Sequence, residues 1–507
     1  MPLEREGADP LNGGLVTGVP PHMVGGAESP DCTNTDPADP WGMTTRAGSA
    51  AAGSALTGAN SGISGDASYL ANAGTLVVRG ASQIYKINYP FVGAYAATSI
   101  FSIVNNASVV GAGAASIMDV AWGFAPLGSA YVASTMPWHR GVITVDTMTP
   151  RIYNVLLDTV STASLPSTDL VYSFTEIFAN RAWLAGVRGD FPNAVRHSAL
   201  NDVSDWTTTS NAGRFLVGGG ANDEIVSVKA TRNAIYWFMR SQLWLTTGTG
   251  PLDFETELVT NNLGCVSVRG TCSDGQGAYF ASDDGIYYVN GLNVTRISDK
   301  ERAAYLAIPD KSKIVLAYKG EKLYCFHNSS GASVNDSAIV AAPRRKIETG
   351  DVQAIWAKWG SLTIGAAFVS ASVRLYGVSN ASTLQVYELE TGSGASNILT
   401  YNSPHWDFRE PEAKKQGVWF NMHVRPLTTA TQTWTVQLKA DGASVGSSYS
   451  IDIASGASHA YVARPGRASW VGNYLGIELS SLGQRTLYGV NAYAEVQAEG
   501  DYPRVRE

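Results

Sequence analysis

The stretches FANRAWLAG at residues 178–186 and HSALNDVSDW at residues 197–206 decide the fold. They predict a strand, a turn and a second strand that closes on an Asp-x-x-Asp-Trp turn, with aromatic residues at both ends. This pattern is typical of one blade-like β unit, and it contains no obvious catalytic group. We take seven of its residues as a structural motif: Asn180, Arg181, Trp183, Gly186, Asp202, Asp205 and Trp206.

Similar short strands recur on both sides of this unit. Residues 75–79 and 83–87 flank a Gly-Ala-Ser turn, and residues 264–297 contain three or four strands with turn residues between them. A period of roughly 40–50 residues per unit is what a propeller shows. The sequence therefore predicts an all-β chain whose residues 67–397 form a β-propeller of about five to seven blades.

The two flanks of this region differ from it and from each other. Residues 1–66 contain several prolines and an Ala/Gly/Ser tract, which leaves little room for helix or strand. Such a segment buries too little apolar surface to fold alone, so we expect an extended N-terminal arm that folds on a neighbouring subunit. After a small-residue linker, residues 398–507 alternate apolar and polar side chains in several runs, which predicts a separate C-terminal β-sandwich.

Composition narrows the function. Charged residues make up 16% of the 507 residues, against about 25% in a typical globular protein. The net charge of −7 argues against a protein that grips nucleic acid by its phosphates, because that grip needs clustered Lys and Arg. A channel through which DNA slides has the opposite requirement, since a neutral or acidic wall does not hold the phosphate backbone.

Three parts of the chain carry a resemblance to one family. The motif at residues 178–206 resembles a segment of propeller proteins in short-tailed bacteriophage tails, the tail nozzle and packaged-DNA-stabilisation proteins. In that family an Asn-Arg-aromatic-aliphatic-Gly strand leads into S-x-L-x-D-x-x-D-W/F. Asn34, followed by Gly42, Arg46 and Gly48, resembles the N…G-x-x-x-R-x-G opening of the same family. Residues 398–415 resemble the strand that leads into its C-terminal domain.

The resemblance implies a virion structural protein and no enzyme. It implies a hexameric ring in the phage tail, assembled in the host cytoplasm, below the portal and in contact with the adaptor, or head-to-tail connector, and with tail fibres. Such a ring retains the packaged genome and conducts double-stranded DNA, without sequence preference, at ejection. No cofactor and no metal are expected. The resemblance leaves open whether the chain is a nozzle or a plug-type stabilisation protein.

Two other functions stay open. A carbohydrate-binding or glycan-hydrolysing propeller needs paired carboxylates, and the candidates are Asp283-Asp284 and Asp223-Glu224. Both pairs lie in predicted hairpin turns, as does the partial Asp-box at residues 273–277. Residues 442–446 have the letters of a GxSxG elbow, but a strand follows where that device needs a helix. The other alternative is a dimeric scaffold that has no central channel.

The remaining chemistry-bearing residues favour structural roles. We expect Trp183, Trp206, Trp237 and Trp244 in the core, and we expect Arg181 and Arg196 to pair with Asp202 or Asp205. The four cysteines have no C-x-x-C spacing and are expected to be reduced and packed. No run of about 18 uncharged apolar residues occurs, so no membrane span is predicted. The best helix signal covers only residues 299–306.

Overall fold

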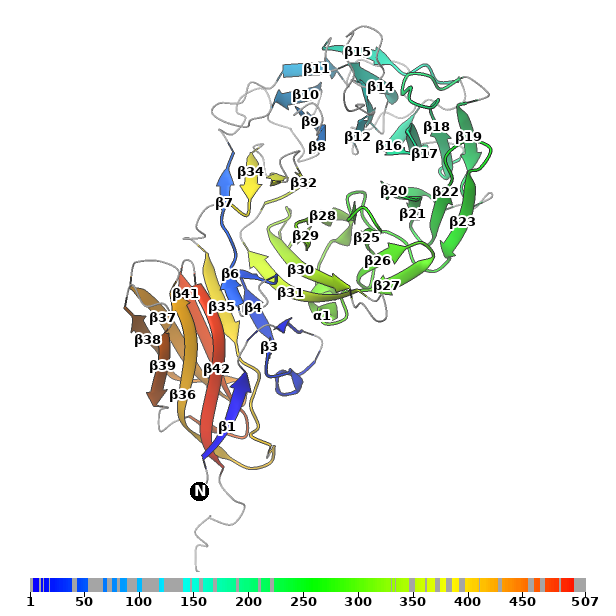
Figure 1. The fold of residues 1–507 in the computed structure, drawn as a ribbon. Helices are drawn as coiled ribbons and strands as arrows, with labels where there is room; N and C mark the ends of the chain where they lie inside the picture. Colours follow the sequence, from blue (N-terminus) through cyan, green and yellow to red (C-terminus); the bar gives the residue numbers. More distant parts are fainter. Residues whose placement is uncertain are drawn as a thin grey trace, which may run out of the picture.

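Short apolar runs separated by turn residues produce a molecule built almost entirely of strands (Figure 1). The computed structural model describes the chain from residue 3 to residue 496, apart from internal gaps. The residues outside the description are 1–2, 9–10, 12, 18, 39–42, 53–66, 71–74, 80–82, 89–97, 103–117, 123–139, 146–147, 155–157, 167–170, 188–190, 208–210, 219–222, 330, 333, 346–351, 361–362, 370–373, 380–384, 392–396, 410, 427–430, 455–459, 466–469, 483–484 and 497–507.

The propeller consists of seven antiparallel blades in the described part of the chain. Six are separate four-stranded sheets, and the remaining blade is the first part of a nine-stranded sheet. In blade 4 the inner strands are the more buried: β21 is buried throughout, whereas outer β23 is largely exposed. Blade 1 contains β8 (Ala67–Leu70), β9 (Thr75–Arg79), β10 (Gln83–Asn88) and β11 (Thr98–Ser102), and blade 2 contains β12 (Met118–Trp122), β13 (Arg140–Val145), β14 (Met148–Asn154) and β15 (Thr159–Thr162). Blade 3 contains β16 (Tyr172–Phe178), β17 (Arg181–Val187), β18 (Ala194–His197) and β19 (Gly213–Leu216). Blade 4 contains β20 (Ile225–Ala230), β21 (Ile235–Met239), β22 (Leu243–Thr247) and β23 (Glu255–Thr260).

The last three blades follow the same order along the chain, with one exception. They are β24 (Thr271–Ser273), β25 (Ala278–Ala281), β26 (Ile286–Asn290) and β27 (Asn293–Arg296); β28 (Val315–Lys319), β29 (Lys322–His327), β30 (Ser337–Arg345) and β31 (Val352–Gly360); β32 (Ala366–Val369), β33 (Leu375–Val378), β34 (Val386–Leu389) and β7 (Ser49–Ala51). The exception is β7, an N-terminal strand that completes blade 7.

The ring of blades is closed. Each innermost strand contacts the next around the ring, from β8 through β12, β16, β20, β24 and β28 to β32, and β32 contacts β8. Because β7 pairs with β34, N-terminal residues supply the outer strand of the blade whose three inner strands come last. The predicted all-β propeller is therefore confirmed, and its blade number is the upper end of the expected range.

The C-terminal region forms a β-sandwich below the propeller (Figure 1). One sheet has the order β39-β36-β42-β6-β5, with β1 also on β42 and β40 also on β36; the other runs β4-β35-β41-β37-β38. Phe420 and Ala492 of the first sheet and Trp434 and Ile477 of the second are buried in one cluster between them. The strands are β35 (Ile398–Asn402), β36 (Lys415–Pro426), β37 (Gln432–Ala440), β38 (Ala443–Ile453), β39 (Ala460–Pro465), β40 (Val471–Gly472), β41 (Leu475–Leu482) and β42 (Arg485–Val496).

The N-terminal arm contains more strand than the sequence suggested. Its described residues form β1 (Leu3–Ala8), β2 (Gly14–Leu15), β3 (Glu28–Ser29), β4 (Asp31–Thr33), β5 (Thr35–Asp36), β6 (Met43–Thr45) and β7, with the 3-10 turn η1 (Pro21–Met23). Most of these strands add to sheets made by residues far along the chain. The described arm therefore pairs with strands of its own chain, whereas the sequence predicted that it folds on a neighbouring subunit. These partner strands supply the hydrogen bonds that the arm lacks locally.

The arm also joins the propeller to the sandwich. Strand β4 pairs with β31 of blade 6 on one side and with β35 of the sandwich on the other, so one nine-stranded sheet runs through both domains. The largest apolar cluster follows the same path, from Leu15 and Cys32 of the arm through Trp356 of blade 6 to Trp434 of the sandwich. A shared sheet and a shared core make this junction stiff.

Helix is scarce in the described residues. The short helix α1 (Arg302–Leu306) lies inside the predicted stretch 299–306, and the 3-10 turn η4 (Lys311–Lys313) follows it. Both belong to the connection between blades 5 and 6. No helix among the described residues is long and apolar enough to cross a membrane.

Candidate functional site at the junction of propeller and sandwich

Asn34 and Arg46, the two polar residues of the opening pattern, meet at the junction. Arg46 is only 4% exposed, and its Nε donates to Asn34 Oδ1 at 3.0 Å while Nη2 donates to the Gly360 carbonyl at 3.2 Å. The guanidinium lies 5.0 Å from the ring centroid of Trp359, whose Nε1 donates to the Thr35 carbonyl at 2.8 Å. Burial lowers the pKa of Arg46 to about 10, which still leaves it charged at neutral pH. We call this set the arm clamp.

A partly buried ion cluster continues the clamp toward blade 7. Lys322 on β29 contacts Asp36 of the arm at 2.7 Å and Glu390 after β34 at 2.5 Å, and Lys319 reaches Glu390 at 3.1 Å. Burial pushes the pKa of Glu390 upward, but Lys322 outweighs it, and the net pKa is lowered. The cluster therefore holds ionised groups from the arm and two blades together.

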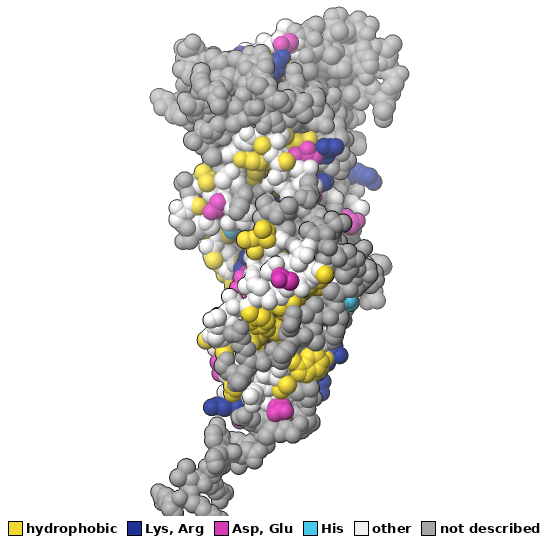
Figure 2. All heavy atoms as spheres, turned by 90° about the vertical axis from the view of Figure 1, so that its left-hand side faces the viewer, with side chains coloured by type: hydrophobic (Ala, Val, Ile, Leu, Met, Phe, Trp, Pro, Cys, Tyr) yellow, Lys and Arg dark blue, Asp and Glu magenta, His cyan; other side chains and the backbone are white. Residues whose placement is uncertain are grey.

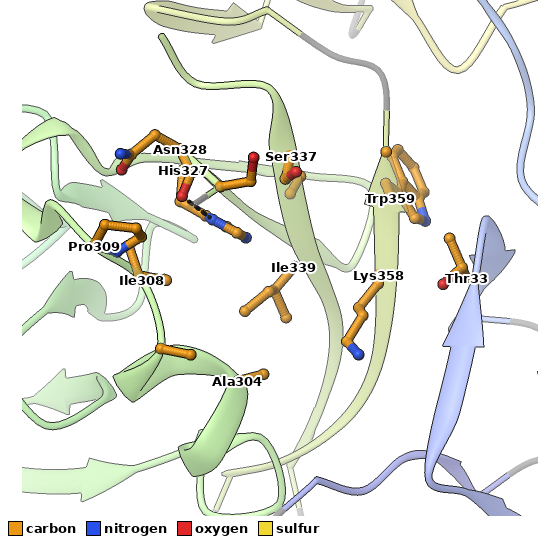
Figure 3. Close-up of a pocket in the computed structure, with 14 residues that line it drawn as sticks. Thr33, Ala304, Ile308, Pro309, His327, Asn328, Ser337, Ile339, Lys358 and Trp359 are labelled. Atoms are coloured by element: carbon orange, nitrogen blue, oxygen red, sulfur yellow. Dashed lines mark hydrogen bonds between the residues drawn. The ribbon is translucent and has the colours of Figure 1, made fainter. Parts of the chain in front are cut away.

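A cavity of about 350 Å³ lies beside the clamp, between the face of blade 6 and the α1 connection (Figure 3). Strand register explains its floor: His327 pairs with Ser337 and Ser337 with Gly360, while Ile339 pairs with Lys358 two residues further along. Residues two apart share one face of a strand, so these side chains face the same way. Ala304, Ile308 and Pro309 form the opposite wall, and Thr33 of β4 closes one edge.

The seven motif residues lie apart from this junction, in blade 3. Ala179 and Asn180 both have positive φ, 48° and 57°, and form the two-residue turn between β16 and β17. Trp183 packs between blades 3 and 4, where its ring centroid is 5.6 Å from that of Trp237. Trp206 packs on the other face, in the cluster shared with blade 2. The expected core placement of these three tryptophans is confirmed.

The polar motif residues hold turns in place. Asp202 Oδ1 accepts from the Ser204 amide at 2.9 Å, and Asp205 Oδ1 accepts from the Thr207 amide at 3.1 Å. Arg181 is buried and donates to the Ser198 carbonyl at 2.9 Å and to Asn211 Oδ1 at 2.8 Å. The expected ion pair between Arg181 and Asp202 or Asp205 is therefore wrong, because backbone and amide oxygens already surround this guanidinium.

Three further residues that the sequence singled out lie in blades 3 and 4. Gly186 has φ +70°, and a Cβ there would lie 2.7 Å from the Phe174 ring, so a glycine is required. Arg196 Nη1 donates to the Trp206 carbonyl at 3.5 Å. Trp244 is only partly buried and packs at the edge of the blade 3–4 cluster.

The carboxylates weighed for glycan hydrolysis serve turns instead. Asp223 accepts from the amides of Arg240 at 3.2 Å and Ser241 at 2.9 Å, and Glu224 pairs with Arg240. Asp284 accepts from Tyr287 Oη at 2.9 Å and pairs with Arg296 at 3.0 Å. In the partial Asp-box, Asp274 accepts from the Gly277 amide at 2.7 Å. The residues of the GxSxG-like stretch form the hairpin between β37 and β38.

The described part of the chain contains neither an activated cysteine nor a metal-binding cluster. Cys32, Cys265, Cys272 and Cys325 are free and buried. Burial raises the pKa of Cys32 and of Cys265 to about 12, so both thiols are protonated at neutral pH. No group of three or more His, Cys, Asp or Glu side chains there is placed to hold a metal ion.

The sequence missed most of the junction. Only Asn34 and Arg46 stood in a recognisable pattern; Trp359, which Arg46 covers, and the ion pair of Asp36 with Lys322 carried no local signal. Trp359 Nε1 and the Thr35 carbonyl are separated by 324 residues in sequence. An alignment of coupled positions is the kind of signal that finds such pairs.

No protein-family model matches the chain, and no curated protein matches it. Among solved structures, the extracellular domain of a putative hybrid two-component system from B. thetaiotaomicron is 13% identical, over 65% of this chain and 39% of that chain. A second such domain from B. thetaiotaomicron is 8% identical, over 66% and 41%. The WD40 β-propeller domain of Doa1 is 9% identical, over 67% and 97%. Each has a TM-score of 0.39, and our propeller assignment rests on sheet order alone.

This chain spans about two fifths of the length of the two B. thetaiotaomicron domains.

Proposed function

We propose that this chain is a structural subunit of a short-tailed phage tail. In this proposal several copies form a ring around the DNA exit channel, below the portal and adaptor. The observation that carries the proposal is the shared sheet through β31, β4 and β35, with the core that follows it. A propeller fixed to a sandwich in this way moves as one body, which suits a part that must withstand the pressure of packaged DNA.

The arm clamp supports the same proposal. Asn34 and Arg46, which carry the family resemblance, are the residues that fasten arm, blade 6 and sandwich together. A sequence pattern that serves rigidity at the domain junction fits a mechanical protein better than a catalytic one. The placement of the candidate carboxylates in turns gives the glycan-hydrolysing alternative no comparable support.

The surface is compatible with extensive subunit contacts. Among the described residues of one face, Figure 2 shows apolar side chains and isolated charged groups of both signs. Ile398 and Leu482 are cross-strand neighbours on β35 and β41, and both are more than half exposed. A pair of exposed aliphatic side chains on a rigid sheet is suited to burial against another subunit.

Cryo-electron microscopy of the native assembly tests the proposal. We expect a ring of copies around an axial pore wide enough for duplex DNA, with sandwich surfaces between neighbouring copies. Particles that contain single propellers, or a closed dimer without a pore, would contradict it. The same maps separate a nozzle from a plug, because a plug closes the pore before ejection.

A further inference from the structure

The cavity beside the arm clamp presents a hydrogen-bond acceptor. His327 Nδ1 lies 3.1 Å from the Asn328 carbonyl, which can only accept, so Nδ1 carries the ring proton. Burial lowers the pKa of His327, which keeps the ring neutral at pH 7. Nε2 is then a bare acceptor, with no hydrogen-bond partner among the described residues. Figure 3 shows this ring directed into the cavity.

The same cavity presents donors on its other side. Lys358 lies 3.2 Å from Asp31 Oδ1, so the pair is neutral overall while the ammonium keeps further N–H groups to donate. The Ser337 hydroxyl, in the strand row between His327 and Gly360, hydrogen-bonds the Asp336 carboxylate, so Lys358 is the donor available to a ligand. A donor and an acceptor beside a neutral ion pair suit a neutral ligand that carries hydroxyl or amide groups.

The remaining wall and the size of the cavity limit the ligand further. Ala304 and Ile308 offer an apolar surface opposite the polar groups, and Ile339 adds an apolar side chain to the floor beside them. The volume of about 350 Å³ exceeds the roughly 150 Å³ of an engineered cavity that holds benzene. The space therefore accepts a ring with substituents, one of them apolar.

We propose that this cavity binds a neutral, hydroxyl-bearing sugar ring of N-acetylhexosamine type. The acetamido N–H donates to His327 Nε2, its methyl group packs against Ile339, and ring hydroxyls accept from Lys358. This site goes beyond the structural role proposed above, and neither idea depends on the other. A ring built as a conduit remains a conduit whether or not its subunits hold a sugar.

Gly360 supplies the means of a sharp test. A Cβ at this position meets no atom within 4 Å, although the residue lines the cavity, and its φ is not in the left-handed region. The Cβ of Gly360→Leu meets no atom and needs no left-handed φ, so its side chain should extend into the open space of the cavity. His327→Phe keeps an aromatic ring of similar size but removes both ring nitrogens, the Nε2 acceptor and the Nδ1 donor to the Asn328 carbonyl.

The experiment is saturation-transfer NMR on the full chain with N-acetyl-D-glucosamine as the probe. We expect wild-type binding with a Kd on the order of 1 mM, about −4 kcal/mol. Gly360→Leu and His327→Phe should each weaken binding at least tenfold. Thr435→Leu, which adds the same side chain at an exposed position of β37, should bind like wild type.

Three results would overturn the proposal: no transfer to the sugar in wild type, binding by both cavity variants as tight as that of wild type, or tighter binding of phenylacetate than of the sugar. Phenylacetate distinguishes a carboxylate site from a sugar site. Circular dichroism checks that each variant is folded. If Gly360→Leu does not fold, Gly360→Ala replaces it and should weaken binding less than His327→Phe.

Discussion

Arg46 shows how one side chain fastens the arm to blade 6. It donates to Asn34 and Gly360 and covers the Trp359 ring, and no described carboxylate shares its charge. Arg46→Ala should lower the free energy of unfolding by about 2–4 kcal/mol, because it leaves buried oxygens without a donor. Denaturant unfolding measures the change. Arg232→Ala, at an exposed position, is the control, and an equal effect of both would refute the role of the clamp.

Glu301 should make stability depend on pH. It is fully buried at the start of α1, where Oε2 accepts from Thr17 Oγ1 at 3.3 Å and Oε1 has no partner among the described residues. Burial raises the pKa of Glu301 to about 9. The unfolded chain releases this proton near its ordinary value, so the contribution to stability is complete below about pH 4.5 and is lost as pH rises toward 9.

Glu301→Gln should remove that slope. We expect the variant to gain on the order of 1–3 kcal/mol over wild type at pH 8, and little at pH 4, because the amide carries no charge to bury. Melting temperatures measured at several pH values between 4 and 9 give both curves. Parallel curves for the two proteins would show that Glu301 is not the buried titrating group.

At the scale of single elements, blade 3 depends on Gly186. A Cβ there would stand 2.7 Å from the Phe174 ring, and φ is +70°. Gly186→Ala should cost about 2–4 kcal/mol from strain and overlap together. Gly275→Ala is the matched control, since Gly275 has φ +87° but open space around it. The difference between the two in denaturant unfolding isolates the overlap, and equal costs would exclude it.

The elements that the sequence predicted are those determined locally. Hairpins such as that around Ala179-Asn180 follow from turn residues and alternation over a few positions. Strands β4 and β7 failed as predictions because each is only three residues long and depends on partners made by residues beyond 350. The cavity could not be predicted from the sequence for the same reason. Its floor exists only when β29, β30 and β31 are aligned in register.

At the scale of the whole molecule, the arm is part of the fold. The sequence alone suggested an extended arm that folds on a neighbouring subunit. Because β4 lies inside a sheet and β7 covers the edge of blade 7, deletion of residues 1–52 should abolish cooperative unfolding and expose sheet edges that aggregate. Calorimetry and size-exclusion chromatography measure both effects. Deletion of residues 1–8, which removes only β1, is the control and should keep a cooperative transition.

Ile398 and Leu482 allow the proposed ring to be tested separately from the stability of the subunit. Both are exposed, so replacing them together by Ser should change the melting temperature little. In a ring that buries this pair between subunits, the double variant should dissociate at higher protein concentration than wild type. Mass photometry over a dilution series measures this. Unchanged assembly would place the subunit contact elsewhere on the sandwich.

Strand β7 has a consequence for how the protein is made. The ribosome releases residues 49–51 early, yet their partner β34 and the inner strand β32 emerge only after six blades have been translated. Strand β7 must therefore remain without its partner until residue 389 has been synthesised. Completion of the circle is a late, slow search between distant parts of one polypeptide. Translation that stops in blade 6 leaves every earlier blade in an open arc.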